Sequence, residues 1–365
     1  MTRAESALAR TVLAKNLKVR KGESVVIEGW AHSLPYVSAL VEETRRLGAE
    51  PLVIYEDERA WWAALAHGRP ATASRISKSE RAAILAADVF VYLWGPEDRP
   101  RLQKLPAAAG GAAFASNDEW YKLGRKAGLR GCRLWVGYAT DLVAKPLGLD
   151  GPRWRGQLQA AGLADAYQMY SRGARIAKAL RDGSSLRIRH ANGTDLTLGL
   201  VGQTPRIEVG LLDKGALARP TGFVANSPAG AVVARVDERM AEGTLVANQP
   251  YLFSGARFGA GRWEFSGGRL VSLQYDDDSA KSIEQSYRTA AEGKDRPGSI
   301  SIGLNPKGRR VPLFEEIESG MFSLGIGGNA FVDGTTKIDF QLFSLTRGAD
   351  VEVDGVPIVR AGQVG

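Results

Sequence analysis

The first half of the chain alternates short β-rich, mostly apolar runs with segments of helical periodicity. The β-rich runs cover residues 24–28, 51–55, 89–93 and 134–138. After the first run, apolar residues recur at helical spacing from Leu34 to Leu47, with Ser33 suited to cap this helix and Gly48 to end it. Strands that are apolar along their length are buried on both faces, as in a parallel sheet covered by helices. We therefore predict an α/β domain with a mostly parallel sheet over residues 1–150.

The pattern changes after a helical stretch at residues 151–182, which we interpret as a connector. Residues 186–190 and 196–198 alternate in polarity around a tight turn at Asn192-Gly193. Short strands and glycine-rich turns then continue to the end, with one helical segment at about residues 279–292. The sequence therefore predicts a second, β-rich α+β domain over residues 183–365.

The bulk composition excludes several classes of protein. With 44% hydrophobic and 24% charged residues, the chain has the composition of a globular protein. A single cysteine, Cys132, excludes a disulfide framework. The N-terminus is already charged, and no apolar run approaches the ~18 residues that a membrane helix needs. These features predict a cytoplasmic protein with no membrane partner.

The net charge of +8, with a pI near 9.5, does not indicate a nucleic-acid partner. The tight basic clusters, residues 18–21 and 307–310, sit beside or include glycine and have the character of turns. Nucleic-acid binding needs a basic stripe combined with a reading element or stacking aromatics, and neither is evident in the sequence. A solvated, mildly basic surface is the simpler interpretation.

Histidine and cysteine are absent from residues 191–365, which limits the metal chemistry of the second domain. His32, His67, His190 and Cys132 all lie upstream. Imidazole and thiolate are the usual nitrogen and sulfur ligands of zinc and cobalt. A metal site here would depend on carboxylates alone, and an oxygen-only site for magnesium or calcium is one alternative. Its candidate ligands are Glu315, Glu316, Glu318 and Asp339, although such an acidic run is more commonly a solvated loop.

Four segments of the second half stand out as motifs. They are Arg-Pro-Thr-Gly-Phe-Val-Ala-Asn-Ser-Pro at 219–228, Gly-Ser-Ile-Ser-Ile-Gly-Leu-Asn-Pro at 298–306, Glu-Glu-Ile-Glu-Ser-Gly-Met-Phe-Ser-Leu-Gly at 315–325, and Lys-Ile-Asp-Phe at 337–340. In this order they resemble the motifs of the aminopeptidase T and S family of metallo-aminopeptidases. The resemblance covers nearly the whole chain. It implies an α/β N-terminal domain, a β-rich catalytic domain of the metallo-aminopeptidase type, and a homodimer that encloses a cavity.

The resemblance also places the family's metal ligands at positions where this chain has other side chains. The glutamate after Pro-Thr-Gly corresponds to Phe223, and the second glutamate corresponds to Ser299. A histidine corresponds to Met321, or to Phe322 after a one-residue shift. In the last His-x-Asp pair Lys337 replaces the histidine, so Asp339 alone is kept. We therefore expect no bound metal, no other cofactor and no catalytic residue.

The resulting hypothesis is a catalytically degenerate aminopeptidase-like protein, a pseudoenzyme that binds a peptide or peptide-like ligand in the former active-site cavity. The predicted ligand-binding residues are Phe223, Ser299, Met321, Phe322, Lys337 and Asp339. On an expected strand, Lys337 and Asp339 would share one face and form a charge pair. An extended peptide would bind by strand addition and side-chain pockets. Two alternatives stay open: an active aminopeptidase or other hydrolase with a rebuilt site, and a structural dimer or complex subunit.

Overall fold

The computed structural model describes residues 2–67, 76–105, 116–253, 256–276 and 279–365. The chain divides into two compact units. Residues 1–163 and 210–228 form the first, here called the α/β unit. Residues 164–209 and 229–365 form the second, here called the β-rich unit.

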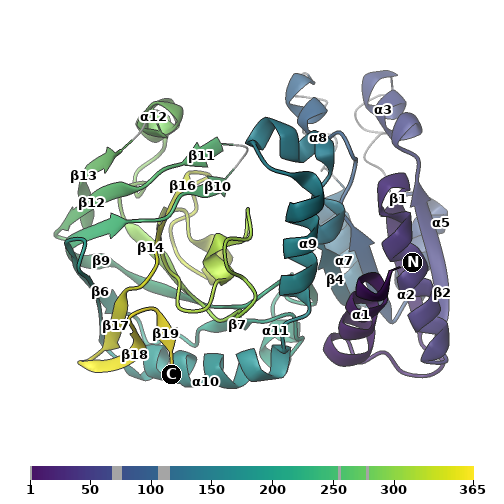
Figure 1. Ribbon diagram of the computed structural model, residues 1–365, viewed down its shortest axis with the longest axis horizontal. Helices are drawn as coiled ribbons and strands as arrows, with labels where there is room; N and C mark the ends of the chain where they lie inside the picture. Colours follow the sequence, from purple (N-terminus) through teal and green to yellow (C-terminus); the bar gives the residue numbers. More distant parts are fainter. Residues whose placement is uncertain (1, 68–75, 106–115, 254–255, 277–278) are drawn as a thin grey trace. The chain divides into compact units, whose positions relative to one another are not determined.

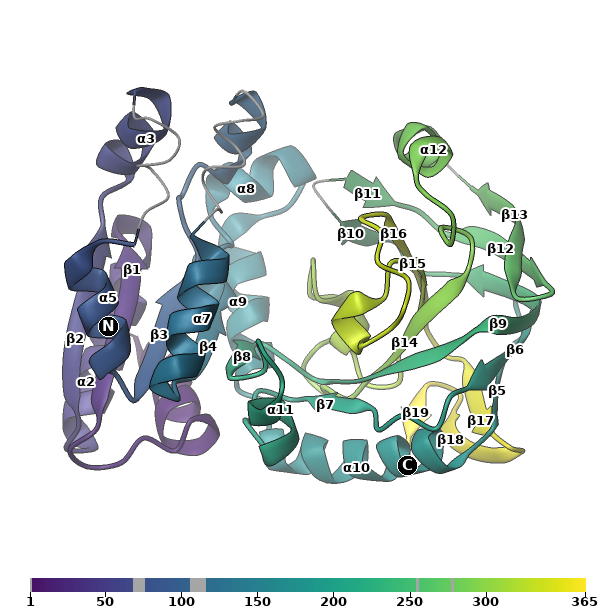
Figure 2. The ribbon, with the colours of Figure 1, turned by 180° about the vertical axis from the view of Figure 1, so that it is seen from behind.

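The α/β unit, shown in Figure 1, is built on a five-stranded sheet in the order β2-β1-β3-β4-β8, whose strands are all labelled in Figure 2. All four strand pairings in this sheet are parallel, as the uninterrupted apolar runs predict. Its strands are β1 (Ser24–Trp30), β2 (Glu50–Glu56), β3 (Val89–Leu93), β4 (Arg130–Leu134) and β8 (Val224–Ser227).

Helices cover both faces of this sheet (Figure 2). One face carries α1 (Arg3–Arg10), α2 (Leu34–Arg46) and α9 (Gly151–Gly162), and the other carries α5 (Lys78–Ala86) and α7 (Asn117–Ala127). Further short helices are a π-helical segment at Thr11–Asn16, α3 (Glu58–His67), η3 (Arg99–Lys104), α8 (Asp141–Ala144) and α11 (Lys214–Ala218). Strand side chains alternate between the faces, so Val26 and Phe90 pack under α5 and α7 with Ile84 and Leu123.

The strand predicted at residues 134–138 lies earlier in the chain, at residues 130–134. The observed strand β4 ends at Leu134, and Trp135–Gly137 forms a 3-10 helix. Leu134 pairs with Leu93, the last residue of β3, so no neighbouring strand remains to extend the ladder. Apolar content marked the segment as buried but did not set its register.

The compact units also divide the chain differently from the predicted domains. Helix α9 packs against α1 and β8 in the α/β unit, whereas α10 (Ala166–Asp182) packs against strands of the β-rich unit. Residues 151–182 are therefore split between the units instead of forming a separate connector. Residues 210–228 return to the α/β unit, because β8 completes its parallel sheet beside β4.

The β-rich unit contains a 12-stranded sheet whose pairings are antiparallel. The strands are β5 (Ser185–His190), β6 (Thr194–Leu200), β7 (Arg206–Glu208), β9 (Ala231–Ala247), β12 (Gly261–Ser266), β13 (Arg269–Tyr275), β14 (Pro297–Gly303), β15 (Phe322–Gly327), β16 (Gln341–Thr346), β17 (Asp350–Val353), β18 (Val356–Arg360) and β19 (Gln363–Val364). The long β9 organises this sheet, since it pairs with β6, β7, β12 and β14. A separate hairpin joins β10 (Tyr251–Phe253) to β11 (Ala256–Phe258), and α12 spans Ser279–Thr289.

Helix α10 packs closely on the β-rich sheet because a glycine faces the strands. A Cβ on Gly173 would lie 2.8 Å from Cγ2 of Ile207 and 3.0 Å from Cδ1 of Leu304. Over the described residues, no helix combines the length and the apolar character needed to cross a bilayer.

Candidate ligand-binding sites

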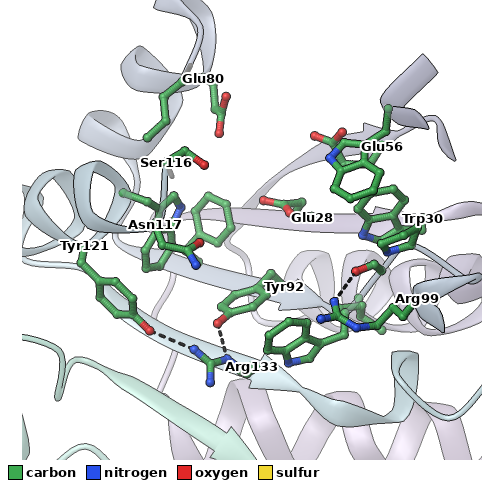
Figure 3. Close-up of a pocket in the computed structure, with 18 of the residues that line it drawn as sticks. Glu28, Trp30, Glu56, Glu80, Tyr92, Arg99, Ser116, Asn117, Tyr121 and Arg133 are labelled. Carbon is green, nitrogen blue, oxygen red and sulfur yellow. Dashed lines mark hydrogen bonds between the residues drawn. The ribbon is translucent and has the colours of Figure 1, made fainter. Parts of the chain in front are cut away.

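The α/β unit contains a cavity of about 320 Å³ near the carboxyl ends of its parallel strands. The chain passes from β1 to β2 on one side, and β3 then lies on the other side of β1. Such a reversal of strand order leaves a crevice at the carboxyl edge, where ligands bind in open α/β sheets. The cavity is lined from β1, β2, β3 and β4 and from α3, α5, α7 and η3 (Figure 3).

Strand register explains why the polar side chains of this cavity converge. Glu28 on β1 is the register partner of Tyr92 on β3, and Tyr92 is the partner of Arg133 on β4. Trp30 is likewise the partner of Glu56 on β2. Partners in adjacent parallel strands point to the same face, so all five side chains project toward the side covered by α5 and α7.

Three carboxyl groups face this cavity: Glu28, Glu56 and Glu80, the last from α5. Burial, reinforced by the charges of Glu56 and Glu80, raises the pKa of Glu28 to about 8. Burial also raises the pKa of Glu56 and of Glu80. Desolvation disfavours the charged form of a carboxyl group, and neighbouring carboxylates add to the effect. Glu28 therefore keeps its proton near neutral pH, where an ordinary glutamate is ionised.

The two arginines of the cavity are held by hydroxyl, carbonyl and aromatic groups. Arg133 donates hydrogen bonds to the hydroxyls of Tyr92 and Tyr121, the latter at 2.9 Å. Arg99 donates to the carbonyl oxygen of Gly95 at 2.7 Å. Both guanidinium groups lie over the ring of Trp94, at 4.6 Å for Arg99 and 5.2 Å for Arg133. No ion pair links either arginine to Glu28, Glu56 or Glu80 among the residues described.

Beside this cavity, His32, Glu58 and Glu97 are the described residues whose grouping could hold a metal ion. Their ligand atoms all lie within 4.8 Å of one another. Nε2 of His32 faces the carbonyl oxygens of Gly137 at 3.0 Å and Trp94 at 3.2 Å, which assigns the ring proton to Nε2. Nδ1 is buried without a hydrogen-bond partner. Glu58 already accepts hydrogen bonds from the backbone amides of Glu97 and Asp98 and from Trp62, so it also has a structural role.

A second pocket, of about 270 Å³, lies on the sheet of the β-rich unit. Ser301 on β14 is the partner of Val233 on β9 and of Ser323 on β15, and Ser323 is the partner of Leu345 on β16. One row of side chains therefore crosses four strands. In the next row, Ser299 and Phe343 face each other across Gly325. A Cβ on Gly325 would lie 2.7 Å from Oγ of Ser299 and 2.8 Å from Cε1 of Phe343, so glycine keeps this part of the pocket open.

Unpaired hydroxyls and apolar walls define the chemistry of the second pocket. Within the described chain, no hydrogen bond engages the hydroxyl of Ser299, Ser301 or Ser323. Glu316 lines the pocket, and burial together with the charge of Glu208 raises its pKa to about 7. The remaining lining residues are Tyr251, Leu252, Ile300, Leu313, Glu315 and Phe331. The pocket thus offers hydroxyl and carboxyl groups against apolar side chains, as in many small-molecule sites.

The structure places Phe223 in the core of the α/β unit. Its side chain is 4% exposed and stacks on Trp120, with 5.9 Å between the ring centroids. A Cβ on Gly124 of α7 would lie 2.7 Å from the Phe223 ring. Because residues 210–228 return to this sheet, Phe223 packs under α7, and Met321 lies in the other unit. These contacts give Phe223 a packing role within its own unit, and its predicted role in ligand binding stays a prediction.

The predicted residues on β14 and β15 separate according to strand alternation. Ser299 faces the second pocket, as described above. Phe322 is 1% exposed, but it does not line the pocket, because its neighbour Ser323 takes the pocket-facing position. Met321 is also 1% exposed, and its carbonyl oxygen accepts a hydrogen bond from the amide of Gly303 at 2.9 Å. These contacts give Phe322 and Met321 packing roles, and their predicted role in binding stays a prediction.

The strand expected at Lys337 and Asp339 is not formed. The chain has no regular secondary structure at these two residues, and both side chains are exposed. No ion pair joins them in the part of the chain that the structure describes. The alternation argument for a shared face therefore fails, since it required extended backbone within a sheet. The oxygen-only metal alternative also loses a ligand, because Glu318 accepts two hydrogen bonds from Arg347, at 2.6 and 2.9 Å.

We expect Lys337→Met and Asp339→Asn each to change the free energy of unfolding by less than about 0.5 kcal/mol. Surface substitutions away from packed or paired groups have effects of this size. Chemical denaturation of the two variants beside the parent protein measures the change. A loss above about 2 kcal/mol for Asp339→Asn would instead indicate a buried charge pair of the predicted kind.

Sequence reasoning missed the cavity of the α/β unit, although the sequence carries a signal for it. Glu28 interrupts a strand that is otherwise almost entirely apolar, and Glu56 ends the next strand. A carboxyl group on a buried strand is costly unless it is paired or faces a polar space. In the second pocket, the alternation of Ser299 and Ser301 with Ile300 and Ile302 likewise indicates a polar face on a buried strand.

Two solved structures share this fold over nearly the whole chain. AmpT of Thermus thermophilus, an aminopeptidase T, is 19% identical, with a TM-score of 0.69 and coverage of 99% of both chains. A 2,5-dihydroxypyridine dioxygenase of Pseudomonas putida KT2440 is 18% identical, with a TM-score of 0.64 and coverage of 99% of this chain and 96% of that chain. No family model matches the sequence, and neither does any curated protein. The resemblance to aminopeptidase T is thus confirmed at the level of the fold.

The two fold neighbours are named for different reactions. One fold neighbour is a peptidase and the other is a dioxygenase by name. A fold that carries two chemistries identifies an architecture, and function must be argued from the side chains of the site.

Proposed function

We propose that the protein is a metal-independent binding protein for a peptide or peptide-like ligand, which it holds in the pocket of the β-rich unit. The observation that carries this proposal is the group of three serine hydroxyls, Ser299, Ser301 and Ser323, that line the pocket without a hydrogen-bond partner in the described chain. Hydroxyl groups both donate and accept, so they match the amide and carbonyl groups of a peptide.

The walls of the pocket fit the amino-terminal end of a peptide. Glu315 and Glu316 provide carboxyl groups for an ammonium group, while Phe331, Phe343 and Leu313 provide apolar contacts for a side chain. A volume of about 270 Å³ is at the low end for small-molecule sites, which favours one or two residues of the ligand. The fold shared with AmpT is in keeping with a peptide ligand.

The metal-binding side chains of the described residues support a metal-independent function. In the described chain, the His/Cys/Asp/Glu group with suitable spacing is His32, Glu58 and Glu97, which lies in the α/β unit. The carboxyl groups that line the pocket, Glu315 and Glu316, are two hard oxygen donors without an imidazole. We also propose that the protein forms a homodimer, and light scattering measures its molar mass in solution.

Calorimetric titration with leucyl-leucine amide tests the binding role. We expect saturable binding, and Ser301→Val should weaken it about three- to tenfold, since one neutral hydrogen bond contributes about 0.5–1.5 kcal/mol. Ser272→Val is the matched control, because Ser272 lies on β13 and does not line the pocket. Equal affinities of the parent and Ser301→Val, or no binding by either, would contradict the proposal.

Metal analysis and a peptidase assay of the same protein preparation distinguish a binding protein from an enzyme. We expect elemental analysis to find no stoichiometric zinc, cobalt or manganese, and leucine p-nitroanilide to remain uncleaved after these metals are added. Chelator-sensitive cleavage that is lost in Ser301→Val would favour an enzyme with a rebuilt site and would contradict the metal-independent function.

A further inference from the structure

Carboxyl groups and a wall of aromatic side chains line most of the cavity of the α/β unit. Four of its lining residues are tryptophans, from β1, α3, the segment after β3, and α7: Trp30, Trp61, Trp94 and Trp120. Phe90 and Tyr92 extend this aromatic wall, since both rings contact Trp120 at centroid distances of 5.2 and 5.9 Å. Trp30 and Trp61 contact edge to face at 5.8 Å. Aromatic faces attract organic cations, and tryptophan does so most strongly.

Arg99 and Arg133 also line the cavity, but no ion pair in the described part of the chain joins either of them to its three carboxyl groups. Glu28 and Glu56 have no hydrogen bond or ion pair with another described residue, and Glu80 accepts only the long 3.3 Å bond from the amide of Ser77 that caps α5. Figure 3 shows Glu28 between Glu56 and Glu80, with Arg133 turned toward the tyrosines. A carboxyl group in such a place is stabilised by a ligand that brings a positive charge.

We propose that this cavity binds an organic cation that carries a primary alkylammonium group, with the ammonium at Glu28 and the alkyl chain along the tryptophan faces. The ligand chemistry comes either from a free amine or from a lysine side chain of a peptide. This inference is independent of the proposed function, since it concerns a different unit and different residues.

The combination of groups favours an organic ammonium over a bare metal ion. A hard divalent ion prefers several oxygen ligands and retained water, whereas this cavity surrounds its carboxyl groups with indole rings. An alkylammonium group satisfies both features, because its charge pairs with the carboxylate and its methylene groups pack on the rings. The volume of about 320 Å³ also exceeds what one ion requires.

The site predicts a dependence of affinity on pH. An ammonium ion binds the ionised form of Glu28, so binding releases a proton while the pH lies below the pKa of Glu28 near 8. Affinity should therefore rise by up to about tenfold per pH unit from about pH 6 to about pH 8 and level off above it. The other titratable or charged groups that face the cavity are Glu56 on β2, Glu80 on α5, Tyr92 on β3, Arg99 on η3, Tyr121 on α7 and Arg133 on β4.

Calorimetric titration of the full chain with 1-aminopentane, and with pentan-1-ol as its neutral counterpart, tests the proposal. We expect the amine to bind at least tenfold more tightly than the alcohol, with the pH dependence given above. Glu28→Gln should weaken amine binding about ten- to a hundredfold and remove most of the pH dependence, because a hydrogen bond to a charged group is lost. Glu50→Gln is the control, since Glu50 lies exposed at the start of β2 and does not line the cavity.

Each outcome of this experiment decides the proposal. Equal affinity for amine and alcohol, or unchanged amine binding by Glu28→Gln, would overturn it. Competition by magnesium that abolishes amine binding would overturn it in favour of a metal site. Tighter binding of 1,5-diaminopentane than of Nα-acetyl-lysine methylamide would support it and identify a free amine as the ligand, and the reverse order would support it and identify a peptide lysine. Unfolding curves of Glu28→Gln verify that the variant is folded.

Discussion

Phe223→Ala is expected to lower the free energy of unfolding of the α/β unit by about 3–5 kcal/mol, the usual loss for a buried phenylalanine. The ring is 4% exposed and packs against Trp120 and Tyr121, so truncation leaves a void in close-packed surroundings. Urea denaturation followed by tryptophan fluorescence measures the loss. Seven of the eight tryptophans belong to the α/β unit, so the signal reports mainly on this unit.

Phe331→Ala is the matched control for this substitution. Its side chain is 41% exposed and lines the pocket of the β-rich unit, so we expect a loss of less than about 1 kcal/mol together with weaker peptide binding. Phe223→Ala should thus lower stability, whereas Phe331→Ala should mainly weaken peptide binding. Weaker peptide binding by Phe223→Ala, without a loss of stability, would instead support the role that the family resemblance assigned to Phe223.

Stability of the α/β unit is expected to fall as the pH rises from about 4.5 to about 8, and Glu28→Gln should remove much of this decline. Burial raises the pKa of Glu28 from 4.5 to about 8, so the folded unit binds more protons than the unfolded chain within this window. Stability then decreases with pH, and the full penalty is reached above the folded pKa. Glu28→Gln should be close to neutral at about pH 4.5 and stabilising by on the order of 2 kcal/mol above pH 8, allowing for water in the cavity.

Glu43→Gln is the contrasting variant for the pH experiment. Glu43 is 6% exposed but accepts two hydrogen bonds from Arg46, at 2.7 and 2.5 Å. Its substitution leaves the arginine without its carboxylate, so we expect a loss of stability at pH 8 instead of a gain. Tryptophan-detected unfolding of the three proteins at several pH values makes the comparison. A stability that is flat between about pH 5 and pH 8, or a Glu28→Gln variant that is destabilised at pH 8, would contradict the role given to the cavity.

The alternation of apolar runs, helical periodicity and glycine-rich turns determined the class of the fold. β1 and α2 occur close to where the sequence predicts them, because continuous apolar runs and amphipathic periodicity are local properties. The hydroxyl of Ser33 does not cap α2 as predicted, since it bonds to the backbone of Trp30. The same patterns indicated the parallel sheet and the change to antiparallel strands after residue 183. Motif order carried the resemblance to aminopeptidase T, which the shared fold supports.

Only the tertiary structure decided which side chains meet. Residues 210–228 return to the first sheet, and this long-range pairing moved Phe223 from a predicted pocket into a core. Register across β14, β15 and β16 aligned Ser301 with Ser323 and opened the second pocket, while the irregular backbone at Lys337 and Asp339 removed the predicted charge pair. In the same way, register across β1, β2 and β3 gathered Glu28, Glu56 and the aromatic side chains. Local sequence sets the period of a strand, but its partners and register depend on non-local packing, and these determine which residues form a site.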